Sequence, residues 1–160
     1  MMDRQICPVG PEPGVAEMLV GALMYSSSAE AAAVLALVHD DDVDPPLNVL
    51  LKAIRTLVGR DVPPSPQLTL DELGRTGSLT RQTATALRTA TTTGACASAA
   101  GHYAAAVVSK SLRRQTESVG TALVAAAGTA PEADLTPLVT NAVLTIRDCA
   151  RRLGALRGEI

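Results

Sequence analysis

The chain has 160 residues, a length that suits one domain, or one domain with an appended element. Apolar residues make up 47%, but there is no Phe or Trp, so Ala, Val, Leu and Ile must form the core; this favours closely packed helices over sheets. A net charge of −2 argues against a generally basic nucleic-acid-binding protein, and no apolar run approaches the ~20 residues that cross a bilayer.

The first half of the chain predicts five short helices. Residues 1–13 hold three prolines, and we expect a flexible N-terminus there. Apolar residues at helical spacing predict helices over residues 14–25 and 29–38. The serines at 26–28 break the first helix, and any of them can cap the second.

Proline and capping residues mark the next three helices. Asp44 is expected as the N-cap of a helix that starts at Pro45 and runs to about residue 58. A proline-rich linker follows, and Thr69 and Glu72 match a capping box for a short fourth helix. The fifth helix is predicted over residues 80–90.

The pattern changes near residue 97, where a long antiparallel hairpin is predicted. One helix can run to residue 127, which is roughly 45 Å at 1.5 Å per residue. After a turn, Thr136 and Pro137 are expected to start the second arm. Its apolar residues fall at coiled-coil spacing: Leu138, Ala142, Ile146, Cys149, Leu153 and Leu156.

The expected fold is therefore all-α. It consists of a flexible N-terminus (1–13), a globular five-helix part (14–96) and a helical hairpin for oligomerisation (97–160). A hairpin this long cannot be fully covered by five short helices, so part of it must meet another copy, another protein or another domain. The alternative, a hairpin folded back on its own globular part, stays open.

No catalytic, cofactor or metal site can be assembled from the sequence. Neither of the two lysines follows glycine as a phosphate-binding loop requires, and both histidines, His39 and His102, are expected at the surface. The aspartates at 40–42 lack the Gly and Glu of a calcium-binding loop, so capping and solubility explain them better. Three cysteines without CxxC spacing indicate free thiols in a reducing cytoplasm.

Basic residues gather on the predicted hairpin. Four of them are candidates for partner contact: Lys110, Arg114, Arg151 and Arg152. They could touch phosphates non-specifically, but the hairpin carries only one aromatic residue, Tyr103, for base stacking. Salt bridges between helices are the favoured interpretation, and direct nucleic-acid binding is expected to be weak or absent.

The order of motifs resembles the N-terminal domain of DnaB-type replicative helicases over residues 14–156. The hairpin start matches best, because the family pattern Y-A-x-x-V-x-x-K-x-x-x-R is similar to the stretch from Tyr103 to Arg114. The other matching segments are Leu19-Val20-Gly21-Ala22-Leu23-Met24, Asp40-Asp41 with Pro46, Pro63, Asp71-Glu72-Leu73 and Gly77-Ser78-Leu79. Where the family usually has Phe-Tyr and then His, this chain has Asp42-Val43 and Leu47.

The resemblance implies a non-catalytic collar module. In the family, hairpins pair between subunits, the domains form a ring of dimers, and the collar binds the DnaG-type primase. The ATPase motor lies in a separate domain that this chain lacks. The hairpin core and interface residues would be Tyr103, Val107, Leu112, Leu138, Ala142, Ile146, Cys149 and Leu153.

Several alternatives stay open at this point. The chain could be the collar domain of a longer helicase, or a free-standing paralogue that binds a helicase, a helicase loader or a primase. It could also be a helical adaptor unrelated to replication, a small helical enzyme or a DNA-binding regulator. All of these readings place the protein in the cytoplasm and away from membranes.

Overall fold

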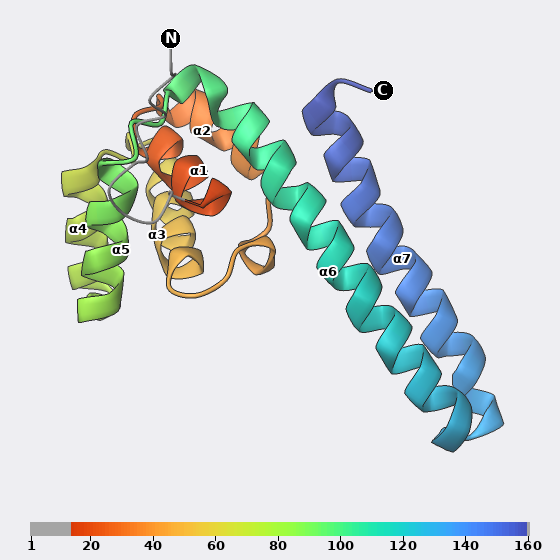
Figure 1. Ribbon diagram of the computed structural model, residues 1–160. Helices are drawn as coiled ribbons and strands as arrows, with labels where there is room; N and C mark the ends of the chain where they lie inside the picture. The colour runs from red at the N-terminus through yellow and green to blue at the C-terminus, as the bar shows by residue number, and fades with distance from the viewer. Residues whose placement is uncertain (1–13, 160) are drawn as a thin grey trace, which may run out of the picture.

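The computed structural model describes residues 14–159, so the predicted flexible segment 1–13 lies outside the described residues. Within that range the chain forms seven α-helices, two short 3-10 helices and no strand. Figure 1 shows α1 to α5 forming a globular part beside the first turns of α6, with α4 and α5 on the side away from the hairpin, while the rest of α6 runs antiparallel to α7 and projects outward. The all-α prediction of a five-helix part followed by a hairpin is confirmed. In order, the elements are α1 (Val15–Met24), α2 (Ser28–Leu35), η1 (Asp40–Asp42), α3 (Leu47–Gly59), α4 (Pro66–Arg75), α5 (Arg81–Thr91), η2 (Ala97–Ala99), α6 (Ala100–Thr129) and α7 (Glu132–Arg157).

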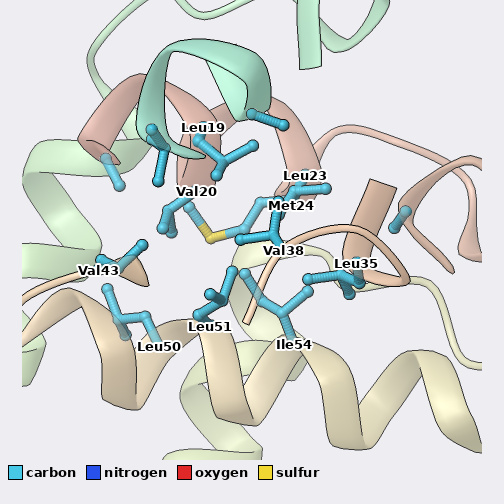
Figure 2. Packing of buried hydrophobic residues seen from close by; sticks show 14 of the residues in the cluster. Leu19, Val20, Leu23, Met24, Leu35, Val38, Val43, Leu50, Leu51 and Ile54 are labelled. Atoms are coloured by element: carbon cyan, nitrogen blue, oxygen red, sulfur yellow. The ribbon is translucent and has the colours of Figure 1, made fainter. Parts of the chain in front are cut away.

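The core surrounds α1, which packs against α3, α5 and α6. The second half of α1, residues 19–24, is buried throughout. Figure 2 shows side chains of α1 facing Leu50, Leu51 and Ile54 of α3, with Val43 at one side of this layer and Leu35 at the other. Burying each large aliphatic side chain contributes about 1.5–3 kcal/mol, so this aliphatic core is sufficient without aromatic residues.

Gly21 allows α5 to cross α1 at close range. A Cβ at this position would lie 2.5 Å from the carbonyl oxygen of Ala90 and 2.9 Å from the Thr93 hydroxyl. No side chain fits at those distances without moving backbone. The glycine is therefore required by packing rather than by backbone conformation.

Two of the predicted helix starts in the globular part are wrong. Asp44 does not cap α3, because this helix begins at Leu47. A residue that precedes proline is disfavoured in the helical conformation, so Pro46 keeps Pro45 out of the helix. The fourth helix begins at Pro66 with Ser65 as its N-cap, so Thr69 and Glu72 lie inside it rather than forming a capping box. The serine cap before α2 and the Thr80 start of α5 are confirmed.

The second arm of the hairpin also starts earlier than predicted. The sequence places its start at Thr136 and Pro137, whereas α7 begins at Glu132 and contains Pro137. The proline removes one hydrogen bond near an exposed tip, where water can solvate the freed carbonyl. Glu132 and Asp134 favour the earlier start because carboxylates stabilise the first turn of a helix.

Candidate interaction surface

The hairpin has a docked half and a projecting half. On α6 the buried residues end at Ser111, and the residues from 112 to 129 are all at least partly exposed. On α7 the buried residues are Cys149, Arg152 and Leu153, all near its C-terminal end. The tip and the distal half of both arms therefore project away from the globular part (Figure 1).

Large aliphatic side chains lie exposed on the projecting half. Val124 is 77% exposed and Leu144 is 59% exposed, although both sit on well-formed helices. A groove of about 240 Å³ runs between the arms there; its lining is Val119, Leu123, Val139, Ala142, Val143, Ile146 and Arg147. We call these seven residues, with Val124 and Leu138, the distal apolar face. A contiguous apolar surface of this kind is typical of a protein-interaction site.

The structure places the eight predicted hairpin residues in two groups. Leu138, Ala142 and Ile146 lie on the distal apolar face, and Leu138 is 40% exposed. The other five lie on the docked half and belong to or pack against the main core: Tyr103, Val107, Leu112, Cys149 and Leu153. The single seam in the sequence is thus divided between the interior of the monomer and its surface.

The four predicted partner-contact residues also have different surroundings. Lys110 is exposed, and Arg151 pairs with Asp148 on the same helix at 2.9 Å. Arg114 reaches from α6 to the Asp44 carboxylate at 3.0 Å and to the Asp41 carbonyl oxygen at 2.8 Å. The prediction for Arg152 needs correction, because its side chain is only 2% exposed and its guanidinium is occupied inside the molecule.

Arg152 and Asp42 form a buried ion pair between α7 and η1 that the sequence did not reveal. Arg152 Nη1 donates to Asp42 Oδ2 at 2.5 Å and to the Leu37 carbonyl oxygen at 3.2 Å. Its Nε donates to Asp148 Oδ2, one helical turn earlier, at 3.0 Å. Asp42 also accepts from the Ser111 hydroxyl at 2.6 Å and from the His39 backbone N–H at 2.8 Å.

This network keeps the Asp42 carboxylate ionised. Burial alone would raise its pKa, but the hydrogen bonds from Arg152, Ser111 and His39, with the positive charge of Arg152, hold the pKa below its usual value. The only local feature of the sequence that indicates this network is the i, i+4 pair of Asp148 and Arg152. The partner Asp42 lies 110 residues away and looked like one of several solvated aspartates.

One groove outside the hairpin is lined in part by polar side chains. It has a volume of about 740 Å³ and lies between the start of α1, the Pro45-Pro46 turn and α5. Its two carboxylates are already engaged, Glu17 with the Gly14 backbone N–H at 3.1 Å and Asp44 with Arg114. Within residues 14–159, His, Cys, Asp and Glu side chains nowhere gather in threes that could hold a metal ion. No helix in that range is both long and apolar enough to cross a membrane.

Comparison with solved structures finds a close match. The chain is similar to the N-terminal domain of DnaB helicase from Mycobacterium tuberculosis, known from a crystal structure, with a TM-score of 0.70 and 30% sequence identity. The match covers 87% of this chain and 99% of that domain. No protein-family model matches the chain, and no curated protein does.

Proposed function

The chain belongs to the family of DnaB helicase N-terminal domains, and on that basis we propose that it is a non-catalytic module that pairs through its hairpin and contacts other replication proteins in the cytoplasm. The distal apolar face carries this proposal. It is formed by two regular helices, yet Val124, Val139 and Val143 are between 42% and 77% exposed. A non-catalytic helicase-associated module has to act through contacts with other proteins.

A second copy of the chain is the occupant that fits this face best. A two-fold arrangement would bring identical apolar faces together, so that each covers the other. The face itself carries one charged residue in its groove lining, Arg147, at the edge. An apolar face that is nearly free of charge is better suited to its own copy than to a strongly charged partner.

The size of the face predicts how tight this pairing is. The free part of α6, residues 113–129, spans about 25 Å, and two adjacent helices are about 20 Å wide. The face therefore offers roughly 500 Å² per partner, less than the ~800 Å² of a standard stable interface. From the hairpin contact alone we expect a dimer with a dissociation constant in the micromolar range.

Sedimentation velocity over a concentration series tests this pairing. Val143→Glu places a carboxylate in the distal groove and should leave the chain monomeric at concentrations where the native chain dimerises. Leu70→Glu on α4 is the matched control, because Leu70 and Val143 are both 42% exposed. A native chain that stays monomeric at tens of micromolar, or a Leu70→Glu variant that dissociates like Val143→Glu, would contradict the proposed pairing.

We also propose that the assembled module binds a DnaG-type primase, a DnaB-type helicase or a helicase loader. The exposed Lys110 and Arg151 on the hairpin are the proposed contact residues. Calorimetric titration of the native chain with each purified host protein tests this directly. Lys110→Glu should weaken the binding, whereas Lys52→Glu on α3, also exposed, should leave it unchanged. Absence of binding to all three proteins would favour the alternative of a helical adaptor that serves other partners.

A further inference from the structure

The C-terminal half of α7 has little apolar burial to hold it in place. Of the residues of α7, only Cys149, Arg152 and Leu153 are buried, and α7 packs mainly along α6. By contrast, α6 contributes Ala100, Ala104, Val107 and Val108 to the core. Segments with few buried apolar contacts tend to open locally without global unfolding.

Polar contacts supply the missing attachment. Arg152 donates to Asp42 of η1 and to the Leu37 carbonyl oxygen after α2, so one side chain joins α7 to two places in the globular part. Asp42 is itself held from α6 by Ser111. Ser111 in turn accepts a hydrogen bond from Gln115 at 3.0 Å. The same loop therefore receives both arms of the hairpin.

We propose that Arg152 is a latch, a positioning residue that keeps the C-terminal half of α7 docked on the globular part. When the latch is broken, this half of α7 opens while α1 to α6 stay folded. Opening would uncover Val108 of α6, which contacts Cys149 and lies on the same arm as the distal apolar face, nearer to the globular part. The latch would thereby control how much of the hairpin is available to other proteins.

Cys149 provides a built-in reporter of this opening. Its side chain is fully buried one turn before Arg152, and its thiol lies 3.7 Å from the Val108 carbonyl oxygen. In a chain with Cys7→Ser and Cys96→Ser, a thiol reagent can reach Cys149 only when α7 opens or the whole chain unfolds. Local opening depends weakly on urea, whereas global unfolding depends steeply on it because much more surface is exposed.

The test measures the labelling rate of Cys149 from zero urea to just below the unfolding transition. Arg152→Lys keeps the charge but cannot reach the separate acceptors of the guanidinium fork, and should speed labelling roughly tenfold or more with a shallow urea dependence. Arg151→Lys is the matched control, because Arg151 is the exposed neighbour and pairs only within α7. Equal rates at two protein concentrations would show that the opening is intramolecular and independent of the proposed pairing.

A second pair of variants tests the same contact by changing Asp42, the partner of Arg152. Asp42→Asn removes the charge that Arg152 binds and should also speed labelling, whereas Asp41→Asn, at an exposed neighbour, should not. If Arg152→Lys does not fold, the Cys149 labelling rates of these two variants test the proposal in its place. Labelling that follows the steep urea dependence of global unfolding in every chain, or that changes equally in variant and control, would overturn the proposal.

Discussion

Replacing Arg152 by Met should destabilise the protein strongly. The variant leaves the Asp42 carboxylate, 1% exposed, without the cation that lies against it. Removing one partner of a buried ion pair typically costs about 3–5 kcal/mol. Ser111 and the His39 backbone N–H would still bond to Asp42, which places the expected loss near the lower end of that range.

Urea unfolding followed by circular dichroism, together with scanning calorimetry at pH 7, measures this loss. For a chain of this size each kcal/mol shifts the Tm by about 2–4 °C, so a loss of about 3 kcal/mol corresponds to a decrease of roughly 6–12 °C. Arg151→Met is the control, because an exposed pair within one helix contributes only about 0.3–0.5 kcal/mol. The double variant Asp42→Leu with Arg152→Met should recover most of the loss, since no buried charge remains. An Arg152→Met loss below about 1 kcal/mol would refute the reasoning.

The same variant should change the pH dependence of stability. In the native chain the pKa of Asp42 is lowered, so its contribution is present above the unfolded value of about 3.9 and is lost as the pH falls below it. In Arg152→Met, burial is no longer offset by the cation and raises the pKa of Asp42, so protonation stabilises the variant as the pH falls from 7. The stability difference between the two chains should therefore narrow toward pH 4, as urea titrations at several pH values will measure. A difference in the free energy of unfolding that stays constant or widens toward pH 4 would contradict the role given to the Asp42–Arg152 pair.

Two further predictions concern single positions. Gly21→Ala should lower the free energy of unfolding by about 1–3 kcal/mol, because its Cβ would meet the Ala90 carbonyl oxygen. Gly120→Ala, in open space within α6, should raise it by about 0.5–1 kcal/mol. Urea unfolding midpoints compare the two variants, and similar midpoints would count against the close α1–α5 crossing. Iodoacetamide should modify Cys96 long before Cys149, because hydrogen bonds from Ser98 lower the pKa of the Cys96 thiol while burial raises the pKa of Cys149. Peptide mass spectrometry reads both sites, and faster modification of Cys149 would be inconsistent with its burial.

The helices and the hairpin could be predicted because their signals are local. Helical spacing of apolar residues and the serine before α2 each act within one or two turns. The errors arose where two local signals competed. Pro46 overrides the capping preference of Asp44, and Ser65 with Pro66 forms an earlier start than Thr69.

The division of the hairpin and its ion pair could not be predicted, because both depend on distant parts of the chain. The apolar spacing continues from Leu138 to Leu153, yet Leu153 is buried while Leu138 is exposed, since the globular part reaches only one end of α7. Asp42 lies within a run of three aspartates, and nothing local distinguishes the one that faces Arg152. The pattern of charges alone therefore predicted that Asp42 and Arg152 lie at the surface, although both are buried.

The most direct test of hairpin pairing is crosslinking between copies from the distal apolar face. In the Cys7→Ser, Cys96→Ser chain, Val139→Cys places a thiol on that face, and Leu79→Cys places one at an exposed position of the globular part. Cys149 is fully buried and should not react in either chain. A short bis-maleimide should convert the Val139→Cys chain to covalent dimer at concentrations where the Leu79→Cys chain stays monomeric. Equal crosslinking of both chains, or none at Val139→Cys, would contradict pairing through the hairpin.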